Sequence, residues 1–364
     1  MSNNIKKAVH PGFYLKEYLL ELQMTQEEFA NRLGISGKQI SLILSENASI
    51  TADIAYKLSK LMGTSIEMWL NLQTKYDAYK VELEYASSFE KEKEVYKFID
   101  KKFLIDLGVI DQKDNIEIAI EKTRRASLVS SLTMHLNKDM VSYYRTSIEK
   151  EETIKNIVCK NVWVSLATSL AKKQEVSNFN EKRLIENIDE FRKMTTMDPS
   201  VFYPKMKKIM DSCGVSLVIL PTLKNSNING VVKWLDSNKV MMALNTRGAS
   251  NDKFWFSFFH ELKHVLQKEK RKTFIGEEQI NENIEVVLEY DADYFAIETL
   301  IPTNKYNELK CYDENSIKMF SKSINIHPGI VVGRLQKEGK IPYSKLNNLK
   351  EKYEIVIDSN TMIW

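Results

Sequence analysis

Short helical patterns, each bounded by capping residues, fill the first seventy positions of the chain. Thr25 precedes an acidic turn, Gly34 follows an apolar run, and Ser36 opens the next segment. Side-chain oxygens before a helix and a glycine after it are usual helix ends. The pattern predicts five helices between about residues 10 and 72, the second and third joined by a short turn that contains Gly34.

Helical spacing also predicts which side chains of this segment are buried. In the first helix, the residues available for an apolar side are Phe13, Tyr14, Tyr18, Leu19 and Leu22. In the third helix, we expect Ile40, Ile43 and Leu44 to face inward and Lys38, Gln39 and Ser41 to face outward.

The middle of the chain, residues 77–198, carries mixed-charge helical patterns. Residues 116–134 and 151–172 are typical of amphipathic helices, and we interpret the region as a helical connector with a possible role in dimerisation. His135 stands alone here, and we expect it to be structural or at the surface rather than a ligand.

From residue 199 the pattern changes to a helix followed by strands. Residues 201–213 predict the helix, and the apolar run 215–220 predicts the first strand. Residues 230–235 and 239–244 predict two more strands, joined by a hairpin turn at 236–238. A final strand is expected over 355–364.

A strongly aromatic stretch follows this sheet and ends in a histidine pair. Residues 254–267 contain no proline or glycine, which predicts one helix with His260 and His264 at positions i and i+4 on one face. Two imidazoles one turn apart can hold one metal ion, and Glu261 between them is left to act as a general base. The same string arises by chance on charged amphipathic helices, so it does not establish a metal site by itself.

A catalytic zinc site requires a third protein ligand. Glu289 and Asp293 lie at i and i+4 in a second helical stretch. Glu289 can supply the missing carboxylate, and Asp293 can accept the remaining N–H of one histidine.

These motifs resemble those of the ImmA/IrrE family of bacterial metallopeptidases, a zincin-like group, over about residues 211–353. The resemblance implies that His260, His264 and Glu289 bind metal and that Glu261 is the general base. It also suggests strand 230–234 as the edge that pairs with an extended substrate, although a purely structural strand is an equal interpretation. Lys263 stands where the family usually has glycine, and Asp293 where asparagine is common.

Residues 8–76 closely resemble the HigA branch of the XRE (Cro/C1-like) repressors. The matching stretches include 24–30, 33–36, 50–53 and 63–73. The resemblance implies binding of double-stranded operator DNA. The residues expected to contact the DNA are Gln26, Ser36, Lys38, Gln39 and Ser41. The alternative is a small helical bundle that mediates protein contacts only.

Composition sets the broad class. The 364 residues are 43% hydrophobic and 28% charged with a formal net charge of +3, which is ordinary for a soluble protein. So small a charge does not argue for nucleic acid, and any DNA interpretation depends on the motif. The start has no apolar signal region and no run approaches a membrane span, so we expect a cytoplasmic protein without membrane contact. The three separated cysteines are expected to be buried, reduced thiols.

The sequence therefore predicts a mainly α chain with a small β-sheet (α+β). We expect a five-helix, lambda-repressor-like helix-turn-helix domain over 1–76, the connector over 77–198, and a zincin-like metallopeptidase domain over 199–364. The predicted function is a dimeric DNA-binding regulator that cleaves a specific repressor or antitoxin-like protein with Zn²⁺, or with Mn²⁺ or another divalent ion. The alternative is a HigA-like antitoxin and autorepressor whose metallopeptidase fold is a non-catalytic sensor or toxin-binding scaffold.

Overall fold

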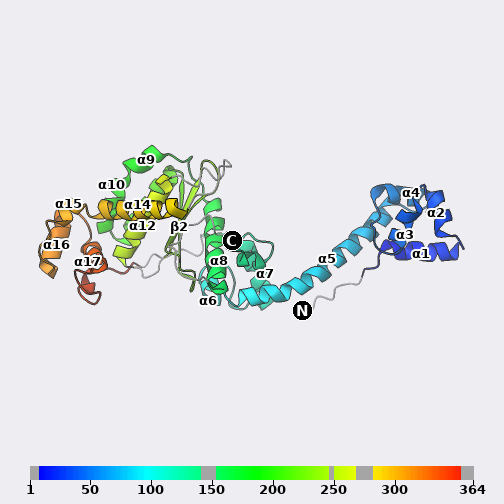
Figure 1. Cartoon of the computed structure of the whole chain (residues 1–364), viewed down its shortest axis with the longest axis horizontal. Helices are drawn as coiled ribbons and strands as arrows, with labels where there is room; N and C mark the ends of the chain where they lie inside the picture. Colours follow the sequence, from blue (N-terminus) through cyan, green and yellow to red (C-terminus); the bar gives the residue numbers. More distant parts are fainter. Residues whose placement is uncertain (1–7, 141–152, 246–249, 268–281, 354–364) are drawn as a thin grey trace. The chain divides into compact units, whose positions relative to one another are not determined.

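The computed structural model describes residues 8–140, 153–245, 250–267 and 282–353 (Figure 1). The chain divides into two compact units, Met1–Lys91 and Glu92–Trp364, and each has its own hydrophobic core. The described residues are mainly helical with one small sheet, which confirms the predicted fold class. The finer division at residues 76 and 198 stays a prediction. No helix among the described residues has both the length and the apolar character needed to cross a membrane.

The first unit is built from short capped helices, as the sequence predicts. Its helices are α1 (Pro11–Glu21), α2 (Gln26–Leu33), α3 (Gly37–Leu44), α4 (Ala52–Met62) and the beginning of α5 (Ile66–Tyr96). Thr25 accepts a hydrogen bond from the N–H of Glu28 at 3.2 Å, and Ser36 accepts one from Gln39 at 3.2 Å. Gly34 between α2 and α3 has φ +68°, a conformation that side chains rarely adopt. These caps fix the turn of a helix-turn-helix.

Two expectations for this unit were wrong. Phe13 and Tyr14 are exposed on α1, and the helix buries Leu15 and Leu19 instead. The fifth helix does not end at residue 72 but continues to Tyr96, because no glycine or proline interrupts residues 66–96.

Helices precede the sheet in the second unit. They are α6 (Lys101–Asp106), α7 (Ile116–Ala126), α8 (Ile154–Lys173), α9 (Glu181–Glu186), α10 (Ile188–Lys193) and α11 (Pro199–Ser212), with 3-10 turns η1 (Leu132–Leu136), η2 (Lys138–Met140) and η3 (Met194–Thr196). The helix expected over 116–134 ends at Ala126, because Leu128 takes a left-handed conformation with φ +55°. Helix α8 is buried on most of its circumference rather than amphipathic, and even Lys160 and Asn161 are buried. His135 is fully buried, which agrees with a structural role. Cys159 and Cys213 are buried as predicted, but Cys311 is exposed.

The sheet has three strands in the order β1-β3-β2: β1 (Val215–Leu220), β2 (Gly230–Trp234) and β3 (Val240–Asn245). Strand β1 pairs with β3 in parallel, and β2 pairs with β3 antiparallel with Gly230 opposite Leu244. Ser216 donates to a carbonyl of α8, whereas its neighbours Val215 and Leu217 join the core that contains α11 and α12. Helices therefore cover both faces, and β2 is left at an edge of the sheet.

The remaining helices complete this core. They are α12 (Asn251–Gln267), α14 (Glu282–Leu300), α15 (Thr303–Tyr306), α16 (Glu314–Ser323) and α17 (Pro328–Lys337), with the 3-10 turn η4 (Asn347–Leu349). Helix α12 packs against β2, β3, α14 and α17. His327 caps α17 by accepting from the N–H of Gly329 at 3.1 Å, so it is a structural turn residue. The strand expected over 355–364 lies outside the described residues.

Candidate metal centre and DNA-binding surface

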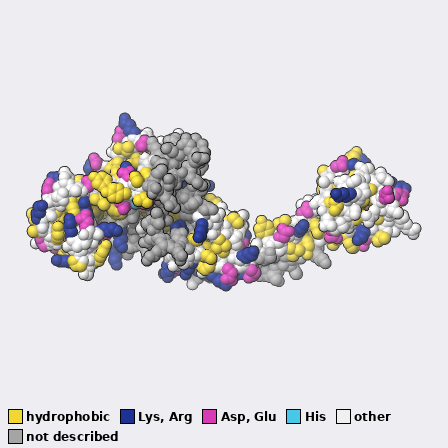
Figure 2. All heavy atoms as spheres, in the orientation of Figure 1, with side chains coloured by type: hydrophobic (Ala, Val, Ile, Leu, Met, Phe, Trp, Pro, Cys, Tyr) yellow, Lys and Arg dark blue, Asp and Glu magenta, His cyan; other side chains and the backbone are white. Residues whose placement is uncertain are grey.

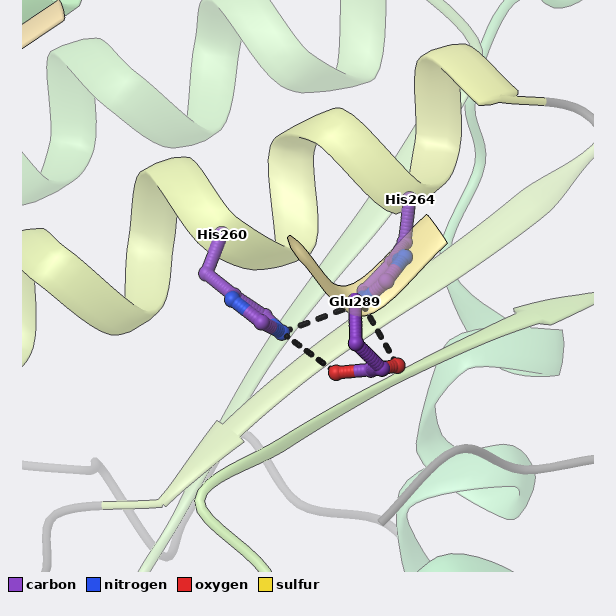
Figure 3. Close-up of side chains that lie close together, drawn as sticks. All are labelled: His260, His264 and Glu289. Atoms are coloured by element: carbon purple, nitrogen blue, oxygen red, sulfur yellow. Dashed lines mark hydrogen bonds and ion pairs between the residues drawn. The ribbon is translucent and has the colours of Figure 1, made fainter. Parts of the chain in front are cut away.

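The two histidines of α12 point toward each other across one turn of the helix (Figure 3). Phe254, Trp255 and the Phe258–Phe259 pair are buried in the core on the other side, so the helix cannot rotate without exposing them. The Nε2 atoms of His260 and His264 lie 3.0 Å apart. Their side chains are only 17% and 7% exposed.

Glu289 reaches the same point from α14. Its Oε2 lies 3.3 Å from His260 Nε2, and its Oε1 lies 3.3 Å from His264 Nε2. The structure thus brings together all three of the residues predicted to bind metal, two from α12 and one from α14.

The spacing of these atoms fits a divalent cation. Three ligand atoms about 2.0–2.2 Å from a tetrahedral ion are separated by roughly 3.3 Å, close to the distances seen here. Glu289 Oε1 is buried and has no hydrogen-bond partner, although an imidazole nitrogen lies nearby. A buried carboxylate oxygen without a hydrogen bond is costly, and a bound cation would satisfy it.

Without a cation, the electrostatics favour a protonated histidine. Burial alone would lower the pKa of His260, but its contacts with Asp293 and Glu289 raise that pKa to about 10. Burial likewise opposes ionisation of Glu289, but the two histidines hold its pKa well below the usual range. A binding cation would therefore displace a proton from His260.

Each histidine is oriented through its second ring nitrogen. Asp293 Oδ1 lies 2.8 Å from His260 Nδ1, which is the contact that the sequence predicts for Asp293. Gln267 Oε1 lies 2.8 Å from His264 Nδ1. Sequence reasoning missed Gln267, although its position three residues after His264 on one helix was the available signal.

Glu261 is buried beside the edge strand, with 7% of its surface exposed. A Cβ atom added to Gly230, the first residue of β2, would lie 2.6 Å from Glu261 Oε1. The carboxylate therefore packs against the backbone of the strand that we expect to bind an extended peptide.

The residues predicted to contact DNA lie on the surface of the first unit. Gln26 opens α2, Ser36 caps α3, and Lys38, Gln39 and Ser41 are on α3, and all five are exposed. Ile40, Ile43 and Leu44 face the core as predicted. In the view of Figure 2, acidic and basic side chains are interspersed over this unit. The mixed charge on this face would make its electrostatic attraction to DNA modest.

Two family models match the chain. A helix-turn-helix model matches residues 15–69, and the model of the IrrE N-terminal-like domain, a peptidase M78 family, matches residues 213–319. The second match contains His260, Glu261, His264 and Glu289.

Curated protein sequences resemble the first unit. The uncharacterized HTH-type transcriptional regulator YbaQ of Escherichia coli K12 is 32% identical over 83 residues, which are 22% of this chain and 74% of that protein. Virulence-associated protein I of Dichelobacter nodosus is 39% identical over 75 residues, 20% of this chain and 69% of that protein.

Among solved structures, a HigA-family antidote protein of Coxiella burnetii is 38% identical, covering 23% of this chain and 94% of that chain with a TM-score of 0.22. The antitoxin HigA of Pseudomonas aeruginosa, solved with the higBA promoter, is 30% identical. It covers 23% of this chain and 90% of that chain, with a TM-score of 0.21. The two family matches agree with the motifs found in each unit, and the curated relatives agree with those of the first unit. The chain therefore belongs to the XRE-type helix-turn-helix regulators and carries, in addition, an IrrE-like peptidase M78 domain.

Proposed function

We propose that this protein is a DNA-binding transcriptional regulator whose second unit is a zinc-dependent endopeptidase for one specific protein, a repressor or an antitoxin-like partner. The observation that carries the proposal is the convergence of His260, His264 and Glu289 on one point. Glu261, whose charge acts on His260, would supply the base that hydrolysis needs. A general digestive role is not favoured, because a DNA-binding unit on the same chain implies a substrate linked to transcription.

The residues have distinct roles in this proposal. When bound, a divalent cation would polarise the scissile carbonyl and lower the pKa of water. His260, His264 and Glu289 would hold it, and zinc is the first choice, although this ligand set also suits Mn²⁺ and other ions. Glu261 accepts the proton of the attacking water and delivers it to the leaving amine. Asp293 keeps the Nδ1 proton on His260, so that Nε2 faces the cation.

The edge strand gives the substrate a defined register. Asn245 donates its N–H to the carbonyl of Asn229 at 3.0 Å, and Leu235 donates to Lys239 at 2.9 Å. Because an antiparallel ladder alternates, Gly230 and Val232 direct their N–H and C=O groups to the other edge of β2, where no strand of the described residues pairs. An extended peptide that paired there would lie beside the strand whose first residue contacts Glu261, which favours a polypeptide substrate.

The test is a comparison of the protein with Glu261→Gln on a proteome-derived peptide library in the presence of zinc. Glutamine has the shape of glutamate but cannot accept the proton, so the variant should keep its metal and produce no new peptide ends. Cleavage that is identical with both proteins, or absent with both, would overturn the endopeptidase proposal.

For the first unit we propose operator binding through α3, with Lys38, Gln39 and Ser41 toward the bases or phosphates and Gln26 and Ser36 toward the backbone. We also propose a homodimer, since two half-sites are read by two copies. Supporting this, the apolar side chain of Leu83 on α5 is 46% exposed, and a second copy could cover it. Selection of binding sequences from random duplex DNA should return two half-sites related by symmetry, and a single unpaired site would contradict the dimer.

A second candidate is a HigA-like antitoxin and autorepressor whose metallopeptidase fold binds a toxin or senses a ligand without catalysis. The observations that favour it are the similarity of the first unit to a HigA-family antidote protein and the presence of Lys263 inside the histidine motif. Glu261→Gln separates the two candidates in cells. An unchanged biological effect supports the antitoxin, and a lost effect supports the protease.

A further inference from the structure

Lys263 lies inside the histidine motif, between the two candidate ligands His260 and His264. Its Nζ lies 3.1 Å from Asp291 Oδ2 on α14 and 5.4 Å above the ring centre of Phe295 on the same helix. The side chains of Lys263 and Asp291 are 25% and 44% exposed. The lysine thus ties α12 to the helix that supplies Glu289, at a position where the resembling family has glycine.

Asp291 also takes part in a second contact that leads to a candidate ligand. Its Oδ2 accepts from Gln267 Nε2 at 3.1 Å, and the same nitrogen donates to the carbonyl of Leu288 at 2.9 Å. Gln267 Oε1 faces His264 Nδ1 at 2.8 Å. A continuous chain of contacts therefore runs from Lys263 through Asp291 and Gln267 to His264; we call these first three residues the Gln267 bridge.

This series of contacts fixes the orientation of the Gln267 amide and the tautomer of the His264 imidazole. If the amide of Gln267 were flipped, its oxygen would face the Asp291 carboxylate and the Leu288 carbonyl, and its NH₂ would face the ring nitrogen. The unflipped amide leaves only an acceptor for His264 Nδ1, so this nitrogen carries the proton. His264 Nε2 then keeps its lone pair and points at Glu289, as a metal ligand requires.

The two histidines differ in how they are oriented. His260 is held by the Asp293 carboxylate directly. His264 is held by a neutral amide whose orientation depends on a charged pair one step further away. Removing a member of that pair weakens the constraint on the amide, and so on the imidazole, without touching the ligand itself.

We propose that the Gln267 bridge is the positioning device for His264, with Gln267 as the positioning residue and the Lys263–Asp291 pair as its anchor. This inference rests on the metal site of the proposed function. Lys263 is then a part of the site, through its ion pair with Asp291.

The experiment measures Zn²⁺ affinity and the Co²⁺ absorption spectrum of the full-length protein and of single variants. Gln267→Met removes the acceptor and the donor at similar size, and Lys263→Met and Asp291→Asn remove the anchor. Lys318→Met is the matched control, because it breaks a Lys–Glu pair of 2.6 Å with Glu314 on the distant helix α16. Circular dichroism checks folding, and the two anchor variants, at partly exposed positions, keep the test open if Gln267→Met does not fold.

We expect Gln267→Met to weaken Zn²⁺ binding by about 10–100-fold and to shift the Co²⁺ bands, which a loss of general stability would not do. Lys263→Met and Asp291→Asn should weaken Zn²⁺ binding by less. Lys263→Met should cause no further loss of Zn²⁺ affinity when it is combined with Gln267→Met, because both residues act through the same series of contacts. Lys318→Met should behave as the unmodified protein.

Wild-type affinity and spectrum in Gln267→Met, or fully additive losses in the double variant, would overturn the bridge. These results are distinguishable from failure of the proposed function itself. If the folded unmodified protein binds no divalent ion, the metal site fails. If it binds zinc and depends on Glu261 for cleavage while Gln267→Met is unaffected, only the bridge fails.

Discussion

Gly230 and Glu261 fit together so closely that no side chain larger than hydrogen has room between them. A Cβ atom at position 230 would lie 2.6 Å from Glu261 Oε1 and 2.7 Å from its Cδ. The glycine has no positive φ, so its small size rather than its backbone freedom is what the site uses. The contact holds the proposed base against the edge strand.

Gly230→Ala should therefore displace the Glu261 carboxylate and leave the three ligands in place. A misplaced general base typically lowers the rate by about 10²–10⁴-fold. The checks are zinc content, expected to stay near that of the unmodified protein, and cleavage of the peptides found with the library. Gly37→Ala is the matched control, since a Cβ there would meet nothing within 4 Å. Full activity in Gly230→Ala would show that the carboxylate can shift without consequence.

Metal removal should destabilise the second unit, because the proposed ligands connect α12 and α14. A ligand present at 100 times its dissociation constant stabilises the folded state by about 2.7 kcal/mol. Adding a chelator should lower the melting temperature of the unmodified protein, whereas His264→Ala should start lower and not respond. An equal chelator response in both proteins would place the stabilising ion somewhere else.

Much of the candidate site was readable from spacing alone. His260 and His264 follow from helix geometry, and the Glu289 to Asp293 spacing follows from the next helix, so their convergence needed only that α12 and α14 pack together. Gln267 was missed because its role depends on Asp291 and Leu288, which are distant in sequence and reach it only through that packing.

The wrong expectation for α8 has a physical origin. Periodicity indicates which residues share a face but not how many faces are covered. Helix α8 carries Lys160 and Asn161 and therefore looked half-exposed, yet the sheet and η1 cover it from different sides. Asn161 is accommodated because its amide donates to the carbonyls of His135 and Asn137 at 2.7 and 3.0 Å.

His135 predicts loss of stability in acid. Burial lowers its pKa from 6.5 to about 4, and its ring nitrogens are buried without hydrogen-bond partners. The unfolded chain therefore takes up a proton from about pH 6.5 downward, while the folded state resists protonation until about pH 4. The shift corresponds to roughly 3 kcal/mol that is present above pH 6.5 and lost as the pH falls to 4.

Urea unfolding at pH 7 and pH 4 measures this contribution. His135→Gln removes the titrating group at similar size, so its stability should fall less between the two pH values than that of the unmodified protein. His10→Gln offers a comparison in the other unit, where the pKa of His10 is also lowered by burial. Equal acid losses with and without His135 would contradict the assignment.

The last prediction concerns α3, the proposed recognition helix. Substitutions of two neighbouring residues on it should impair DNA binding in different ways. Lys38 and Gln39 are both exposed at the beginning of the helix, but only the lysine carries charge. If Lys38 contacts phosphate, Lys38→Ala should weaken binding to all duplexes and reduce the slope of log affinity against log salt by about 1. If Gln39 reads a base, Gln39→Ala should keep that slope and lose about 1–3 kcal/mol of discrimination against a mismatched half-site.

Lys60→Ala on α4, whose Nζ lies 5.3 Å over the Tyr56 ring, controls for the loss of an exposed lysine. Salt titrations of binding to the selected operator distinguish the two roles, and a Lys38→Ala, Gln39→Ala double variant that still protects the same operator would remove α3 from the interface.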